Sequence, residues 1–162
     1  KAAVLDFGAA KSFYQILAGS GVDVVANVDD ADFVAVSDAP YYSVEDESLL
    51  GQISNIIGSK SVVGFGHGAA MVALACGGEI ERLPFGDHGV NIPVKCSGGG
   101  RNEITVQNHI YKAVPDGTIE EEFTNIHDNT CEGFVCKEHK AAGLGFVPNS
   151  NWLNEVLKSI MS

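Results

Sequence analysis

Short apolar runs alternate with helical patterns along the first half of the chain. Each run is followed by a turn rich in glycine or polar residues, which is typical of buried strands. The predicted strands cover residues 2–5, 22–26, 33–36 and 62–65. Apolar residues at helical spacing predict helices over 9–18, 49–57 and 69–76. Strands that alternate with helices predict a parallel sheet covered by helices on both faces.

The pattern changes after Gly77, where extended pieces follow one another without helices between them. These pieces cover residues 80–83, 90–94, 103–106, 123–127, 131–136 and 144–147. A hairpin turn is expected at 128–130, and cap-forming residues at 149–151 precede a last amphipathic helix. We therefore expect a single domain over residues 1–162. Its predicted fold is α/β, with a mostly parallel central sheet, helices on both faces and a small antiparallel extension.

The composition favours a globular protein and argues against two classes of partner. Apolar residues make up 45% of the chain, which is enough for a core. Ten basic residues against 21 acidic ones give a net charge of −11, so neither nucleic acid nor an anionic membrane is an expected partner. Residues 61–78 carry no charged side chain, but their five glycines and His67 argue against a membrane span. Four scattered cysteines do not form a disulfide scaffold, so a reduced, cytoplasmic location is expected.

Two motifs with possible ligand chemistry are better explained by structure. Gly64-x-Gly66-x-Gly68 follows a strand as in dinucleotide-binding turns, but its third glycine is misplaced and the strand comes late in the chain. We interpret it as a structural turn. A second set contains four potential zinc ligands, His127, Cys131, Cys136 and His139. Its spacing differs from a zinc knuckle, and regular alternation would place the two thiols on opposite faces of a strand. No metal and no other cofactor is therefore expected.

Three segments together resemble one family of enzymes. Residues 85–95 resemble the F-G-x-x-G-x-N-x-P-V-K segment of the carbamoyl-phosphate synthetase small subunit, and residues 104–109 resemble its I-T-x-Q-N-H segment. Residues 63–77 resemble the strand, bend and helix that carry the nucleophile in that subunit. The chain is therefore identified as a member of the class I glutamine amidotransferases, with a flavodoxin-like fold. The resemblance further implies that the N-terminal domain of that small subunit is not part of this sequence.

The resemblance implies a catalytic triad whose three positions are changed here. In the family, a cysteine at the bend attacks the side-chain amide of glutamine, a histidine activates it and a glutamate orients the histidine, and ammonia passes to a synthetase. The corresponding residues of this chain are Gly66, Val147 and Asn149. Glycine offers no nucleophile, valine cannot move a proton, and asparagine carries no charge to stabilise an imidazolium. We predict that the domain has no glutaminase activity.

The resemblance also implies a vestigial glutamine pocket. Its expected residues are Gly68, Asn108, His109 and Tyr111. Ile110 stands where the family has a glycine that lets the substrate backbone approach. The glycine-rich loop that helps to hold glutamine in the family corresponds to residues 37–40, which read Ser-Asp-Ala-Pro.

The leading hypothesis is a catalytically inactive amidotransferase-like domain that acts as a structural or regulatory partner of a synthetase-type large subunit, in pyrimidine or arginine biosynthesis. A second copy of the chain is a further candidate partner. One alternative is an enzyme with other chemistry, such as a hydrolase, that uses Asp38, His67 or His109; it requires both histidines to lie near acidic groups. Another is a small-molecule binding module. It requires an open pocket over Gly66 that Tyr41, Ile110 and Val147 leave free.

Overall fold

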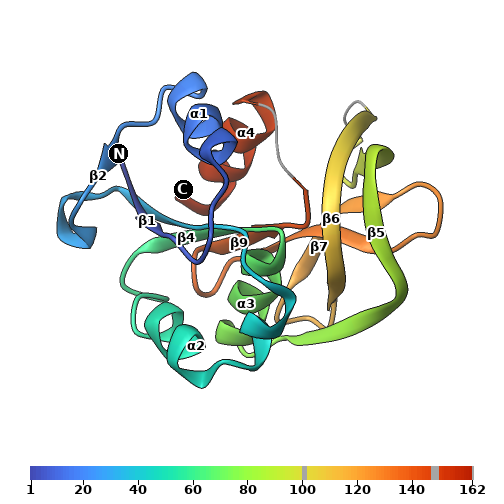
Figure 1. Cartoon of the computed structure of the whole chain (residues 1–162), viewed down its shortest axis with the longest axis horizontal. Helices are drawn as coiled ribbons and strands as arrows, with labels where there is room; N and C mark the ends of the chain where they lie inside the picture. The colour runs from blue at the N-terminus through green and yellow to red at the C-terminus, as the bar shows by residue number, and fades with distance from the viewer. Residues whose placement is uncertain (100–101, 147–149, 162) are drawn as a thin grey trace.

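The central element of the fold is one mixed sheet. The computed structural model describes residues 1–99, 102–146 and 150–161 (Figure 1). Within this part of the chain, nine strands pair in the order β2-β1-β3-β4-β9-β8-β7-β5-β6. The parallel strands are β1 (Ala2–Leu5), β2 (Val24–Val25), β3 (Phe33–Val36), β4 (Ser61–Phe65) and β9 (Ala141–Leu144). The antiparallel strands are β5 (Glu79–Cys96), β6 (Glu103–Val114), β7 (Glu120–Asn125) and β8 (Cys131–Cys136).

Helices cover both faces of the parallel half, as the alternating pattern predicts. In Figure 1, α1 (Lys11–Gly19) and α4 (Ser150–Met161) lie above the sheet, and α2 (Glu47–Ser54) and α3 (His67–Ala75) lie below it. Two short 3₁₀ helices, Val28–Asp30 and Tyr41–Glu45, complete the connections of this half.

Each face of the sheet has its own apolar core. Phe33 and Ala35 of β3 pack in the core on the α1 and α4 side, with Leu17 and Leu153. Val34 and Val36 pack in the core on the α2 and α3 side, with Ile53 and Met71. Successive side chains of a strand point to opposite faces, so a strand buried on both faces must be apolar throughout. This is why the first half of the sequence reads as continuous apolar runs.

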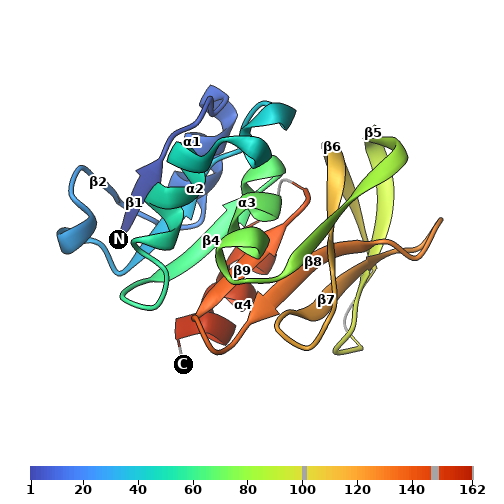
Figure 2. The same cartoon turned by 90° about the horizontal axis from the view of Figure 1, so that it is seen from below.

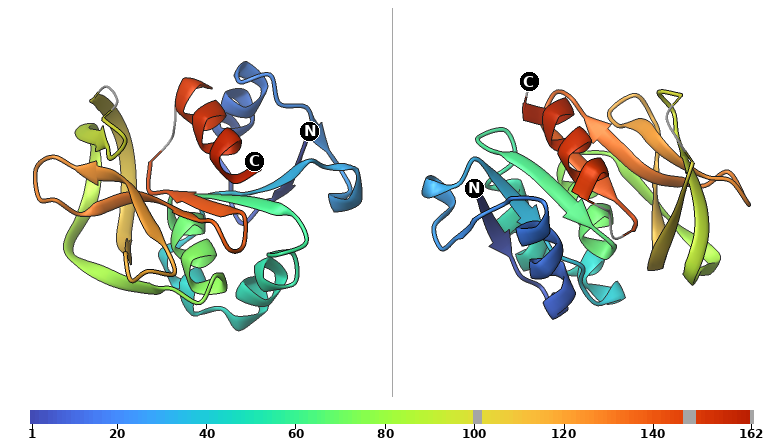
Figure 3. Two further views of the ribbon diagram at one scale, coloured as in Figure 1. Left: turned by 180° about the vertical axis from the view of Figure 1, so that it is seen from behind. Right: turned by 90° about the horizontal axis from the view of Figure 1, so that it is seen from above.

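The antiparallel part is larger than the small extension that we predicted. It contains four of the nine strands, and the β5–β6 pair stands to one side of the helical layers (Figures 2 and 3). The predicted pieces 80–83 and 90–94 belong to the single strand β5, whose pairing with β6 shifts register between Arg82 and Asp87 and again between Gly89 and Ile92. The prolines and glycines of this segment interrupt the hydrophobic alternation, but bulges keep the backbone extended.

The C-terminal third has the predicted order of elements, but β7 covers Glu120–Asn125 instead of 123–127 and the last strand is displaced. A turn over 128–130 joins β7 to β8, with Asn129 at φ 60° and the Asp128 carboxylate accepting the Thr130 amide at 3.0 Å. The last strand lies at Ala141–Leu144, earlier than predicted, because its small residues carry no alternating pattern. The last helix is α4. None of the described helices has the length and apolar character needed to cross a membrane.

Candidate functional site

The bend between β4 and α3 is formed by a glycine whose backbone few other residues adopt. Gly66 has φ 56° and ψ −128°, and α3 begins at the next residue. Gly64 and Gly68 are required by close packing: a Cβ on Gly64 would collide with the Gly68 carbonyl, and a Cβ on Gly68 would collide with the Ser37 carbonyl. The three glycines thus let α3 sit directly on the ends of β3 and β4, which explains the motif as a turn.

A carboxylate occupies the space above this bend. Asp38 follows β3, and its Oδ1 accepts the backbone N–H of His67 at 2.8 Å and that of Ala39 at 2.9 Å. A Cβ added to Gly66 would lie 2.5 Å from the Asp38 Cγ and closer still to Oδ1. The Asp38 carboxylate therefore takes the position that a side chain at residue 66 would need.

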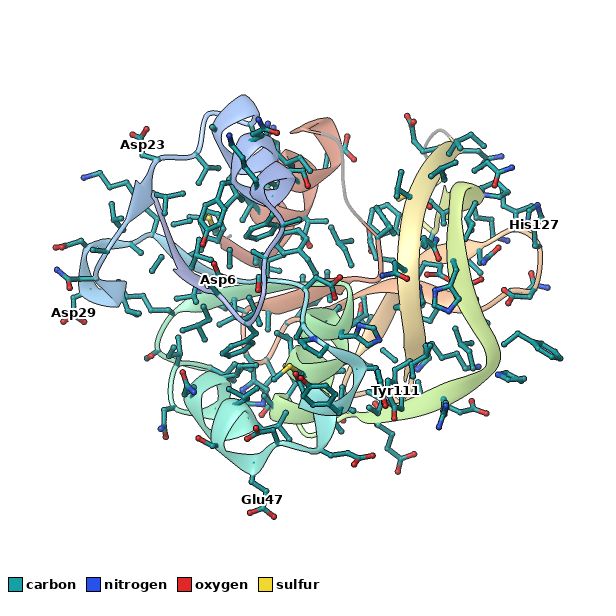
Figure 4. All side chains as sticks on the ribbon, in the orientation of Figure 1. Asp6, Asp23, Asp29, Glu47, Tyr111 and His127 are labelled. Atoms are coloured by element: carbon teal, nitrogen blue, oxygen red, sulfur yellow. The ribbon has the colours of Figure 1, made fainter. Side chains whose placement is uncertain are left out.

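His67 completes this arrangement from the first turn of α3. Its Nδ1 lies 3.3 Å from the Asp38 Oδ1, and its Nε2 accepts the Ile110 N–H at 3.4 Å. Because Nε2 accepts a hydrogen bond, Nδ1 carries the proton that faces Asp38. The Tyr111 ring packs edge-on near the imidazole, with centroids 6.3 Å apart (Figure 4). Burial acts against the charged form of Asp38, but hydrogen bonds from the ring and amide of His67 and from Ala39 hold its pKa below the usual value.

A second histidine lies in a buried polar cluster on β6. His109 is 1% exposed; its Nδ1 donates to the Tyr111 carbonyl at 2.8 Å, and its Nε2 lies 3.0 Å from the Glu132 Oε2 and 3.1 Å from the Gln107 Oε1. Burial alone would lower the pKa of His109. The hydrogen bond and negative charge of Glu132 outweigh burial and raise that pKa. Gly145 makes room for this pair, since a Cβ there would lie 3.0 Å from both groups.

Asp87 joins the same cluster from the neighbouring strand. The β5–β6 register places Asp87 opposite His109, and one atom each of Asp87, His109 and Glu132 lies within 4.8 Å of the others. The Asp87 Oδ2 is buried and has no hydrogen-bond partner. Burial, followed by the negative charge of Glu132, raises the pKa of Asp87.

Two cavities adjoin the bend. The larger, of about 170 Å³, opens between Gly66, Asp38 and the start of α1, and it is lined mainly by apolar side chains. Those side chains are Phe13, Ile16, Leu17, Phe65, Phe146 and Leu153. The smaller, of about 10 Å³, lies between Gly66, His109, Tyr111 and Glu132. Neither Tyr41 nor Ile110 lines the larger cavity. The Ile110 side chain lies instead near Gly86, where an added Cβ would be 3.0 Å from it.

The predicted site residues are only partly brought together. Gly66 lies at the bend; Asn108 lines the larger cavity, and His109 and Tyr111 line the smaller one. Gly68 lines neither of these two, because it packs against Ser37. Val147 and Asn149 lie outside the described residues. The assignment of these residues to a vestigial site stays a prediction.

Sequence reasoning did not find Gln107, Asp87 and Glu132 as neighbours of His109. Glu132 did carry a signal, since it is an acidic residue within an otherwise uncharged strand, Cys131–Cys136. The structural requirement of the alternative enzyme is met, because both histidines lie near a carboxylate. However, both ring nitrogens of His67 and of His109 face protein atoms, so acid–base chemistry on a substrate would require either ring to give up one of these contacts.

The four ligands of the supposed zinc set do not form a cluster among the residues described. Strand β8 is not regular: Cys131 pairs with Thr124 and Gly133 pairs with Phe123, so Glu132 is an extra residue between them. As a result, Cys131 and Cys136 are buried in the same core instead of on opposite faces. The group in the described part of the chain that could hold a metal ion is instead Asp87, His109 and Glu132.

Comparisons with known proteins identify the family. A model of the class I glutamine amidotransferases matches residues 10–152. The chain is 30% identical over 161 residues to the carbamoyl phosphate synthase small chain of Clostridium perfringens, covering 93% of this chain and 46% of that protein. It is 29% identical to the arginine-specific small chain of Bacillus subtilis, covering 98% of this chain and 51% of that protein. The chain thus spans about half the length of these two relatives.

Solved structures agree on the fold. A putative GMP synthase protein from Thermoplasma acidophilum superposes with a TM-score of 0.77 at 16% identity, covering 99% of this chain and 91% of the other. A glutamine amidotransferase from Thermotoga maritima gives 0.68 at 15% identity, covering 90% and 74%. The α/β sheet with a bend at Gly66 and the sequence matches lead to one conclusion: this chain belongs to the class I glutamine amidotransferase family and is related to the small chain of carbamoyl phosphate synthase.

Proposed function

We propose that this chain is a catalytically inactive amidotransferase-like domain that acts as a structural or regulatory partner of a synthetase large subunit. The observation that carries the proposal is at the bend. Gly66 supplies no nucleophile, and the Asp38 carboxylate occupies the space that a nucleophilic side chain would need.

The electrostatics of the bend also support inactivity. In hydrolases built on such a bend, the backbone N–H after the nucleophile stabilises the oxyanion that forms during acyl transfer. Here that group is the His67 N–H, and it donates to Asp38. The lowered pKa of Asp38 keeps this carboxylate ionised at neutral pH. A developing oxyanion would therefore meet a negative charge where it needs a donor.

The relatives and the exposed surface both point to a synthetase large subunit as the partner. The two relatives named above are small chains of carbamoyl phosphate synthase, so a large synthetase subunit is the natural candidate. The β5–β6 pair also exposes large apolar side chains, with Phe85 95%, Val90 75% and Ile104 65% exposed. A partner that packs on this pair would cover apolar surface that is otherwise left in water. Such a partnership would occur in the cytoplasm.

A glutaminase assay tests the first half of the proposal. We expect no glutamine-dependent release of ammonia from the purified chain, measured beside the Clostridium perfringens small chain as an active control. Release at an enzyme-like rate would overturn the proposal.

Copurification tests the second half of the proposal, with the synthetase large subunit taken from the organism that supplies this chain. We expect a complex that makes carbamoyl phosphate from ammonia but not from glutamine, and failure to form any complex would refute the partner role.

A second candidate function rests on the larger cavity. Its volume of about 170 Å³ and its apolar lining fit a small apolar ligand, as a binding module that reuses the old cleft would require. Screening of small apolar compounds by ligand-observed NMR tests this. Filling the cavity with Ala10→Phe should abolish any binding while Gly19→Ala, which has open space around it, should not.

A further inference from the structure

One carboxylate oxygen of the polar cluster around Asp87 has no hydrogen-bond partner. A buried carboxylate oxygen normally has hydrogen-bond donors, because removing it from water without them is costly. The Asp87 Oδ2 has none, although one atom each of His109 and Glu132 lies within 4.8 Å of the Asp87 carboxylate. An ion seated between these groups would supply the partner that this oxygen lacks.

The donor atoms converge as they do around a metal ion. The His109 Nε2 lies 3.0 Å from the Glu132 Oε2 and 3.1 Å from the Gln107 Oε1, and the Asp87 carboxylate completes a set within 4.8 Å. Zinc binds nitrogen and carboxylate oxygen at about 2.0–2.2 Å, which places neighbouring ligands roughly 3.3 Å apart in a tetrahedral site. Small side-chain shifts therefore suffice to seat an ion.

The surrounding hydrogen bonds hold these atoms ready. The Nδ1–H of His109 donates to the Tyr111 carbonyl, which directs the Nε2 lone pair towards the carboxylates when the ring is neutral. The Glu132 Oε1 accepts from Thr130 at 2.9 Å and from Asn125 at 3.4 Å, which leaves Oε2 for a further partner. Metal-binding histidines and carboxylates are typically oriented by such outer contacts.

We propose that Asp87, His109 and Glu132 bind a divalent transition-metal ion of the zinc class, with the Gln107 amide oxygen as the fourth donor. The ligands come from β5, β6 and β8, and β7 separates β8 from the other two in the sheet order. The ion would thus tie the β5–β6 pair to the rest of the sheet. Gln107, His109 and Glu132 are each at most 3% exposed, and the adjoining cavity of about 10 Å³ has room for about one water, so the proposed role of the ion is structural.

Zinc binding to the purified chain tests the proposal. The chain is equilibrated with Zn²⁺, freed of excess metal, and its zinc content and affinity are measured. We expect one zinc per chain in the wild type, and binding weakened by at least about tenfold in Asp87→Asn and Glu132→Gln. Asp23→Asn is the matched control and should bind like the wild type, because Asp23 is exposed (Figure 4) and precedes β2, at the opposite edge of the sheet from β5 and β6. Cobalt substitution should give a spectrum without a thiolate charge-transfer band.

Folding defects do not obscure this test. The unpartnered Asp87 Oδ2 makes no hydrogen bond to lose, so metal-free Asp87→Asn should unfold at the same temperature as the metal-free wild type or higher. Zinc should raise the unfolding temperature of the wild type and of Asp23→Asn but not that of Asp87→Asn. The proposal is overturned by absent zinc binding in the wild type, by equal binding in Asp87→Asn and Glu132→Gln, or by a thiolate band that assigns the metal to Cys131 or Cys136.

Discussion

Replacing Gly66 with alanine should test whether the Asp38 carboxylate occupies the bend. The new methyl group would lie 2.5 Å from the Asp38 Cγ and 3.1 Å from its Cβ, so the carboxylate must move. The residue would also keep a backbone at φ 56°, ψ −128° that side chains rarely adopt. The substitution therefore combines backbone strain with the loss of two hydrogen bonds, those from the His67 and Ala39 N–H groups.

The two costs can be separated by magnitude. Strained backbone of this kind costs on the order of 1–3 kcal/mol. Hydrogen bonds to a charged group are each worth about 1.5–3 kcal/mol, but the Asp38 side chain is half-exposed, so water replaces part of the loss and we take about 1–2 kcal/mol in all. We expect Gly66→Ala to lower the free energy of unfolding by about 2–5 kcal/mol. In an Asp38→Gly background only the strain remains, so the expected coupling energy is about 1–2 kcal/mol.

Equilibrium guanidinium unfolding, followed by far-ultraviolet circular dichroism at neutral pH, measures all four proteins of this cycle. Gly77→Ala is a matched control, because Gly77 has φ 82° but open space around its would-be Cβ. It should cost about 1–2 kcal/mol and should be additive with Asp38→Gly. If Gly66→Ala costs the same in both backgrounds, Asp38 does not fill the space over the bend, and the part of the argument for inactivity that rests on Asp38 fails.

Three further predictions concern titration and helix capping. The folded pKa of Asp38 is lowered, so its stabilising contribution is present above the unfolded value of 3.8 and is lost as pH falls through the folded pKa. In a pH series of thermal unfolding, Asp38→Asn should therefore show a smaller drop in unfolding temperature in acid than the wild type. In the metal-free chain the folded pKa of His109 is raised, so its stabilising contribution is complete below 6.5 and is lost as pH rises through the folded pKa. With metal removed by a chelator, Glu132→Gln should flatten that alkaline decline in a pH series of thermal unfolding. Asp46 caps α2 by accepting the Ser48 and Leu49 N–H groups at 2.9 and 3.1 Å, so Asp46→Ala should cost about 1 kcal/mol in chemical unfolding, with Glu45→Ala as the neutral control.

The sequence by itself determined the parallel half of the fold, because the information there is local. Strand β3 is apolar at every position, and the helix that follows Gly66 is buried along most of its length and carries no charged side chain. The bend itself was predictable too, since three glycines spaced two apart can be placed on a strand-to-helix turn. Even the loss of a nucleophile at residue 66 is visible in the sequence, because the residue type alone decides it.

Only the tertiary structure decided which polar groups meet. Asp87, His109 and Glu132 are 22 and 23 residues apart along the chain, and they converge because the β5–β6 register sets Asp87 opposite His109 while a bulge in β8 directs Glu132 inward. Likewise, Asp38 reaches the bend because β3 and β4 are neighbours in the sheet. Register and bulges depend on long-range hydrogen bonding, which leaves no periodic trace in the sequence.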